Sequence, residues 1–217
     1  MRRDSGQIAR ERAPAHHFSS WTAQKHAERM GMWLFLATEI LLFAGLFTGY
    51  TMYRYLYPET FHQASKVLDV YLGTANTIVL ITSSFTVAMA VYFAKTGRNR
   101  LVALMLLLSF AMGAAFLTVK GFEYAHKFHE GALPGKFYSM KELALPGAPM
   151  FFTVYFLTTG LHAIHVCIGM AILLWVAVRA FLDQFTPKHY TAVELGGLYW
   201  HLVDLIWIFL YPLLYLV

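Results

Sequence analysis

Five long apolar runs constrain the fold more than any other feature of this sequence. They fall at residues 30–53, 71–94, 101–119, 150–179 and 196–217, and about 20 residues of helix are enough to cross roughly 30 Å of hydrocarbon. The bilayer interior offers no water to backbone groups, and no run shows the strict alternation of a barrel strand. The sequence therefore predicts an all-α integral membrane protein, a bundle of five transmembrane helices.

Composition and charge agree with a membrane setting. Hydrophobic residues make up 58% of the 217 positions and charged residues only 13%, which is too apolar for an ordinary soluble domain. The net charge of +5 does not indicate nucleic-acid binding, because six of the seventeen Lys and Arg residues precede Met30 and the others flank the apolar runs. A single cysteine, Cys167, excludes a disulfide within the chain.

The distribution of basic residues predicts the orientation. If the connections alternate sides, eleven Lys and Arg residues fall on the side of the N-terminus and six on the other. Basic residues favour the cytoplasmic side, so we expect a cytoplasmic N-terminus and a periplasmic C-terminus. Residues 1–29 contain no apolar core and are expected to form a cytoplasmic tail with an interfacial turn around Trp21, followed by a transmembrane domain at 30–217.

Glu39 is the most informative polar residue inside an apolar run. It lies nine residues into the first run, with no basic residue within two helical turns. A charged side chain at this depth costs about 3 kcal/mol, so we expect Glu39 to be protonated and hydrogen-bonded to a neighbouring helix. Two roles are compatible with this position: a structural hydrogen bond between helices, or proton handling.

Polar side chains form a stripe along each of the last two runs. Residues three or four positions apart share a helix face, and we expect the two faces to meet, with His201 and Asp204 forming a hydrogen-bonded lock. Small residues on the same runs would allow close approach. The stripes are Thr158, His162, His165 and Gly169, and Glu194, Gly197, His201, Asp204 and Tyr211; the small residues are Gly160, Gly169, Gly196 and Gly197.

Histidines in a membrane also raise the possibility of a haem or metal site. His162 or His165 together with His201 could supply two facing imidazoles, whereas a carboxylate-bridged metal centre would need repeated Glu-x-x-His pairs. The stretch "EYAHKFHE", with His126, His129 and Glu130, has metal-like spacing but is typical of a solvated helix end. We expect no metal, no haem and no catalytic residue in this chain.

Several of these stretches carry a resemblance to a known family. "MWLFLATEILLFAGLF", "FEYAHK", "TTGLHAIHVCIGM" and "VELGGLYWHLVDLIWIFLYPLLY" occur in this order over residues 30–217. In these motifs the sequence resembles subunit III of the haem-copper cytochrome c oxidases, in its five-helix bacterial form. The combination of "GLHAIHV" with "YWHLVDLIW" is far more specific than any single buried histidine.

The resemblance implies an accessory membrane subunit without haem or copper, which lie in the partner subunits. Such a subunit packs on subunit I, with subunit II and possibly a small subunit IV or a larger supercomplex nearby, in the bacterial inner membrane. It binds phospholipid and supports proton entry and the durability of the catalytic centre. By the same resemblance Glu39 is the buried carboxylate and Arg179 a residue for a lipid phosphate; the interhelical polar framework comprises Asn76, Glu123, His162, His165, Glu194, His201 and Asp204.

Two departures and several alternatives remain open. The long form of the family has seven spans, and this sequence corresponds to the last five, so another chain would have to complete a lipid cleft. The loop at 126–149 is longer than in the long form and is a candidate subunit contact. The alternatives are a subunit of a quinol oxidase or a nitric-oxide-reductase-associated relative, a self-standing proton channel or transporter, and a haem-binding electron carrier.

Overall fold

The computed structural model describes residues 18–140 and 143–217, and this part of the chain is almost entirely helical. Apart from a single bridge between Thr186 and His189, it contains no β-structure. The elements, in chain order, are α1 (Trp21–Leu56), α2 (Pro58–Lys66), α3 (Val70–Lys95), α4 (Asn99–His129), the short 3₁₀ helix η1 (Gly135–Phe137), α5 (Ala148–Phe181) and α6 (Thr191–Tyr215).

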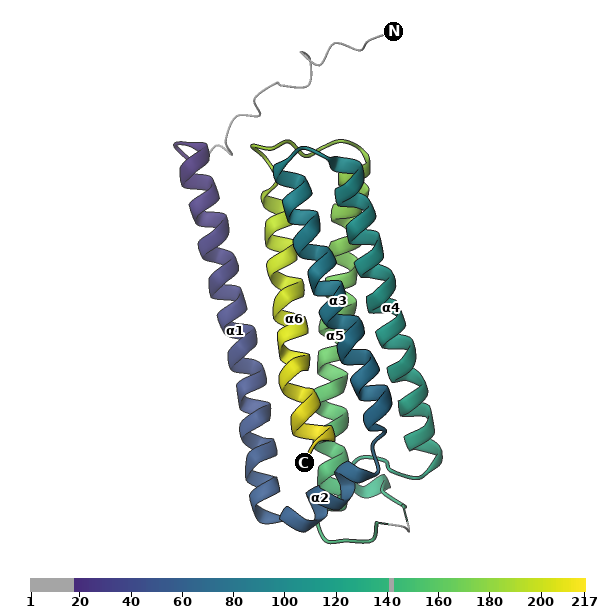
Figure 1. The fold of residues 1–217 in the computed structure, drawn as a ribbon. Coiled ribbons are helices and arrows are strands. Elements are labelled where there is room, and N and C mark those ends of the chain that lie inside the picture. The colour runs from purple at the N-terminus through teal and green to yellow at the C-terminus, as the bar shows by residue number, and fades with distance from the viewer. Residues whose placement is uncertain (1–17, 141–142) are drawn as a thin grey trace. The chain divides into compact units, whose positions relative to one another are not determined.

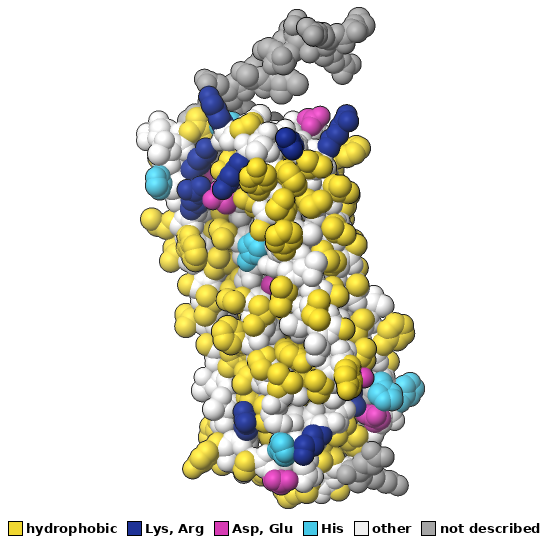
Figure 2. All heavy atoms as spheres, viewed as in Figure 1, with side chains coloured by type: hydrophobic (Ala, Val, Ile, Leu, Met, Phe, Trp, Pro, Cys, Tyr) yellow, Lys and Arg dark blue, Asp and Glu magenta, His cyan; other side chains and the backbone are white. Residues whose placement is uncertain are grey.

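The predicted set of five spanning helices is confirmed. Among the described residues, α1, α3, α4, α5 and α6 are long and apolar enough to cross a membrane (Figure 1). Their lengths of 25 to 36 residues exceed the roughly 20 that a bilayer core requires. Figure 2 shows hydrophobic side chains over the middle of the helices, with charged side chains gathered near helix ends.

The chain forms two compact units, 1–38 and 39–217, and each is described by itself. In the first, α1 begins at Trp21, and the Ser20 hydroxyl accepts a hydrogen bond of 3.2 Å from the Ala23 backbone N–H. This is the usual geometry of a serine N-cap. The interfacial turn expected around Trp21 is therefore the first turn of a helix, while residues 1–17 of the expected tail lie outside the described residues.

Four helices of the second unit form a closed arrangement. α3 packs against α4 and α6, and α5 packs against the same two helices; α2 contacts α5 and α6 (Figure 1). Trp200 of α6 is fully buried, and its indole Nε1 donates to the Ser83 hydroxyl of α3 at 3.0 Å. A Cβ added to Gly113 of α4, or to Gly169 of α5, would lie 2.8 Å from the Trp200 ring. The four helices thus meet around one indole.

The end of α4 differs from the sequence prediction. The third apolar run ends at residue 119, and the count of basic residues by side assigns Lys120 and Lys127 to the connection that follows it. The helix instead continues to His129, and both lysines are buried, at 5% and 4% exposure. No Gly or Pro that could stop a helix stands between residue 122 and Gly131. The charged residues therefore end the apolar run without ending the helix. The following loop is correspondingly shorter than the expected 126–149.

Tight turns fix the ends of the spanning helices. The Asp69 carboxylate caps α3 by accepting from the backbone N–H groups of Tyr71 and Leu72, at 2.9 and 3.1 Å. Gly147, at the start of α5, has φ +88°, and a Cβ there would lie 2.5 Å from the Tyr57 ring. This position therefore requires glycine both for its backbone conformation and for space.

Candidate functional site

Glu39 of α1 lies against His165 of α5, within the unit formed by residues 39–217. The carboxyl Oε2 and the imidazole Nε2 are 2.7 Å apart, and the two side chains are only 16% and 10% exposed. The edge of Phe43 covers the imidazole, with the ring centroids 5.3 Å apart. The predicted hydrogen bond from Glu39 to a neighbouring helix is confirmed, whereas its protonation stays a prediction.

The second ring nitrogen of His165 limits how this pair can hold protons. Nδ1 lies 2.8 Å from the Leu161 carbonyl oxygen, which can only accept, so Nδ1 must carry a hydrogen. Nε2 then either accepts a hydrogen bond from a protonated Glu39 carboxyl or, as part of an imidazolium, donates to the Glu39 carboxylate. In both forms the pair holds one shared proton and has no net charge.

His162, one turn earlier on α5, has a different environment. It is fully buried between Phe116 of α4 and Trp207 of α6, with ring centroids 5.6 and 5.3 Å away. Among the described residues, neither of its ring nitrogens has a hydrogen-bond partner. The structure therefore places His162 in an aromatic slot instead of the hydrogen-bonded framework expected from its polar stripe.

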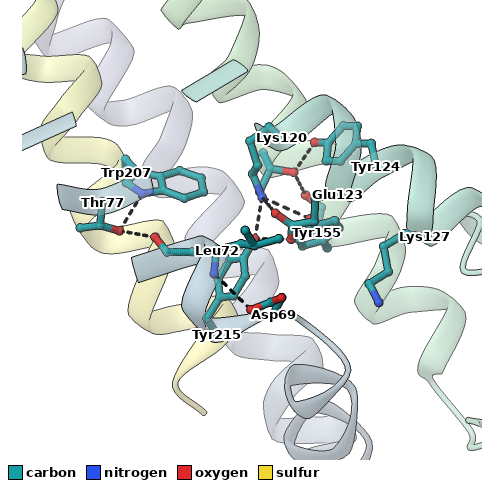
Figure 3. A network of polar contacts seen from close by, with 12 residues as sticks. Asp69, Leu72, Thr77, Lys120, Glu123, Tyr124, Lys127, Tyr155, Trp207 and Tyr215 are labelled. Atoms are coloured by element: carbon teal, nitrogen blue, oxygen red, sulfur yellow. Dashed lines mark hydrogen bonds and ion pairs between the residues drawn. The ribbon is translucent and has the colours of Figure 1, made fainter. Parts of the chain in front are cut away.

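A second buried ion pair lies on α4. The ammonium of Lys120 donates to Glu123 Oε2 at 3.1 Å and to the hydroxyls of Tyr155 and Tyr215 at 3.2 and 2.6 Å. Both tyrosine hydroxyls in turn donate to Glu123 Oε1. Figure 3 shows the side chains of α4, α5 and α6 converging on these charges. Glu123 is therefore part of an interhelical polar cluster, which the resemblance implied but which needed a lysine that sequence reasoning placed in a loop.

Three polar residues of α6 make contacts with α3, whereas the Tyr199 hydroxyl donates to the His165 carbonyl of α5. His201 Nδ1 lies 2.6 Å from the Ser84 hydroxyl, Trp207 Nε1 donates to Thr77 at 3.0 Å, and the hydroxyls of Tyr211 and Thr74 are 2.6 Å apart. The expectation that the α5 and α6 stripes pair with each other is therefore wrong for these residues. Side chains three or four positions apart share a face, but that face also borders α3.

The expected lock between His201 and Asp204 is also wrong. Asp204 is 3% exposed, and neither of its carboxyl oxygens has a hydrogen-bond partner in the part of the chain that the structure describes. Ser84 lies beside it, but the Ser84 hydroxyl engages the His201 ring. Asn76, another member of the expected framework, is buried with its side-chain Nδ2 unpartnered. A buried polar group without a partner costs about 1–3 kcal/mol of stability. Asp204 and Asn76 therefore lower the stability of the fold.

The glycines expected to permit close approach do so at three of four positions. A Cβ at Gly169 would lie 2.8 Å from the Trp200 ring, one at Gly196 would lie 3.2 Å from Ile172, and one at Gly197 would lie 3.3 Å from two valines of α3. At Gly160 the nearest atom would be 3.9 Å away, which is ordinary contact. Gly113, which the sequence reasoning did not single out, completes the slot around Trp200.

Arg179 and Glu194 lie at helix ends. Arg179, in the last turn of α5, donates from Nε to Gln184 Oε1 at 3.0 Å, and its guanidinium lies 4.8 Å from the Trp175 ring centroid and 5.1 Å from that of Phe185. Glu194 lies in the first turn of α6, where a carboxylate interacts favourably with the helix dipole. The use of Arg179 for a lipid phosphate stays a prediction.

The imidazoles do not form the facing pair that a haem would need. His165 faces Glu39 of α1, His201 faces α3, and His162 lies between two aromatic rings. At the end of α4, His126 Nε2 lies 3.0 Å from Glu130 Oε1, and within the described residues no three His, Cys, Asp or Glu side chains come together in a metal-like group. The haem and metal alternatives therefore find no matching geometry.

Sequence reasoning missed Lys120, Tyr155 and Tyr215 as members of a site. A usable signal was present, because Lys120 and Glu123 are three positions apart and a helix extended past residue 119 places them on one face. The two tyrosines gave no such signal. Their role depends on how α5 and α6 cross α4, which spacing along a single helix does not reveal.

Comparison with known proteins agrees with this geometry. A family model described as "Cytochrome c oxidase subunit III" matches residues 8–217. A "Probable cytochrome c oxidase subunit 3" of Nocardia farcinica is 32% identical over 188 residues, which cover 87% of either chain. A "Quinol oxidase subunit 3" of Bacillus spizizenii is 28% identical over 86% of this chain and 85% of its own. A "Heme-copper oxidase subunit I+III" of Aeropyrum pernix is 31% identical over 91% of this chain but only 23% of its own length.

The fold and the buried polar pairs define a multi-pass, all-α membrane protein in which several ionisable side chains of the spanning helices, among them Lys120, Glu123 and Asp204, are buried. The family match covers nearly the whole sequence, and two of the three relatives match along most of theirs. This chain belongs to the cytochrome c oxidase subunit III family, whose members are subunits of haem-copper oxidase complexes.

Proposed function

We propose that this chain is a non-redox accessory subunit of a bacterial terminal oxidase that packs on the catalytic subunit I and supports proton uptake and the durability of the catalytic centre. The Glu39–His165 pair is the observation that carries the proposal. The pair holds one shared proton at membrane depth. The Glu39 side chain is still 16% exposed, so this proton can be reached from outside the unit. Passing this proton to a neighbouring group would leave one negative charge on Glu39, and a proton taken up from another group would neutralise it again.

Packing on subunit I is supported by a relative whose name combines subunits I and III in one chain. The described helices also carry many exposed large hydrophobic side chains, including Leu41, Ile78 and Phe122, which suit either lipid or the helices of a partner. We place the N-terminus in the cytoplasm of a bacterial inner membrane, with subunit II and possibly smaller subunits beside it.

Phospholipid binding is a further part of the proposal. The Arg179 guanidinium is held at the end of α5 by Gln184 and by the Trp175 and Phe185 rings. A guanidinium fixed at headgroup depth can bind a phosphate through two parallel N–H groups. This arrangement supports a lipid phosphate near the predicted cytoplasmic end of α5.

A quinol oxidase remains the alternative for the complex, because one of the relatives carries that name. A self-standing channel or transporter finds less support. In the described residues each of the five candidate spans is one α-helix without interruption, whereas transporters bind their ions where helices are broken at mid-membrane.

The Glu39→Gln variant tests the proton role. The Gln amide can still donate to His165 Nε2 while Nδ1 donates to Leu161, so we expect normal assembly. The variant has no proton to exchange, so we expect turnover at high pH, where protons are scarce, to slow or to end in earlier inactivation. The measurement is the pH profile of oxygen consumption by the purified complex, together with its active lifetime.

The matched control is Glu59→Gln, an exposed carboxylate on α2 that pairs only with Gln63. It should leave both the profile and the lifetime unchanged. If Glu39→Gln behaves like this control, the pair has a structural role only.

A further inference from the structure

The last turn of α6 is held by five other elements. The Tyr211 hydroxyl meets Thr74 of α3, and the backbone oxygen of Leu213 accepts from the Tyr50 hydroxyl of α1. Just beyond the helix, the Val217 oxygen accepts from Ser65 of α2 at 2.7 Å. Tyr215 contacts both α4 and α5 through the Lys120 cluster. Pro212 lies within this turn and removes one of its internal hydrogen bonds, so contacts from outside must hold it.

The Lys120 cluster is the charged part of this assembly, and its hydrogen bonds form a closed set. The three ammonium hydrogens have three acceptors, on Glu123, Tyr155 and Tyr215. Each Glu123 oxygen has at least one donor. The side chains of Lys120 and Glu123 are 6% and 3% exposed, so one positive and one negative charge balance each other away from solvent (Figure 3).

Aromatic rings complete the enclosure of the ammonium. The Lys120 Nζ lies 5.0 Å from the Trp207 ring, 5.1 and 5.2 Å from those of Tyr155 and Tyr215, and 5.9 Å from that of Tyr124. A cation within about 6 Å of an aromatic face is attracted by the ring. The rings come from α4, α5 and α6, so the ammonium keeps its full set of neighbours only when these three helices are correctly placed.

We propose that Lys120 and Glu123 form a charge lock, defined as this ion pair with the hydroxyls of Tyr155 and Tyr215, that fixes the last turn of α6 against α4 and α5. Its role is to select one arrangement of the three helices, since burying an ion pair adds little net stability. Removing one charge leaves the other buried and unpaired, which is strongly unfavourable, whereas replacing both by neutral side chains of similar size is tolerated. The lock is separate from the Glu39–His165 pair and does not depend on proton uptake.

A double-mutant cycle in the full oxidase complex tests this proposal. We expect Lys120→Met and Glu123→Gln each to lower the temperature at which the subunit is released by about 10 °C. The double variant should stay within about 3 °C of the native complex, because no unpaired charge remains. Lys66→Met, at an exposed lysine in the last turn of α2, is the matched control and should have no effect. If either single variant cannot be assembled, assembly of the double variant decides the same question.

Amide hydrogen exchange on the same complexes locates the effect. In the single variants we expect exchange to accelerate about tenfold or more at residues 213–217, with no change around His165. In the double variant the release temperature should recover, but exchange at residues 213–217 should stay faster than in the native complex, because the contacts that fix this turn are gone. The proposal is overturned if the single variants leave release and exchange unchanged, or if the double variant releases the subunit as early as the worse single one. It is also overturned if the double variant exchanges residues 213–217 at the native rate, or if exchange rises equally throughout the chain.

Discussion

Gly169→Val should prevent stable assembly of this subunit, with a loss of about 3 kcal/mol in its folding free energy. The Cβ alone would lie 2.8 and 3.0 Å from Cε3 and Cζ3 of Trp200, and 3.4 Å from Tyr199. The indole has little room to move, because a Cβ on Gly113 of α4 would already lie 2.8 Å from its Cη2 and its Nε1 is bound to Ser83. The measurement is the yield of subunit in the purified complex and the temperature of its release.

The matched control for this prediction is Gly160→Val, the same substitution two and a half turns earlier on the same helix. The nearest atom to its new Cβ would be the Tyr124 hydroxyl at 3.9 Å, so we expect a much smaller loss. Equal losses at the two positions would show that valine is unfavourable on α5 in general, and would contradict a tight slot around Trp200.

His165→Leu should have the second largest effect. It leaves the Glu39 carboxyl, 16% exposed at membrane depth, without the partner that shares its proton, and a buried polar group that loses its partner costs about 1–3 kcal/mol. We expect earlier release of the subunit on heating and faster loss of oxidase activity. The Glu39→Leu, His165→Leu double variant should recover most of the thermal stability but not the active lifetime.

His129→Leu is the control for that experiment, since His129 is an exposed imidazole in the last turn of α4. It should leave both measurements unchanged. A His165→Leu complex that is as stable as this control would mean that Glu39 finds another partner, and would contradict the assignment of the shared proton to this pair.

The spanning helices could be predicted from the sequence because the bilayer imposes a length and forbids unpaired backbone. The same reasoning misplaced the end of α4, where Lys120 and Lys127 lower the hydropathy. The ammonium groups of these lysines are bound by Glu123 of α4, by Glu130 directly after α4 and by the Val67 carbonyl of the α2–α3 connection, so both lysines can remain in the helix. Hydropathy does not distinguish a loop from a helix whose charges are paired within the protein.

The residues of the candidate site could be predicted from the sequence better than the contacts between them. Glu39 and His165 were both identified, but spacing along one helix could not show that they bind each other across α1 and α5. For the same reason the expected His201–Asp204 lock gave way to a contact between His201 and Ser84. A face of a helix follows from the sequence, while the partner of each side chain depends on how the helices cross.

The most direct measurement is the composition of the complex after gentle solubilisation. Quantitative mass spectrometry, together with a haem spectrum of each separated subunit, would measure the ratio of this chain to subunit I and the location of the haem. We expect one copy of this chain for each subunit I, with all haem absorbance in other subunits. Absence of the chain from the stoichiometric complex, or haem that purifies with this chain alone, would contradict its role as a non-redox subunit.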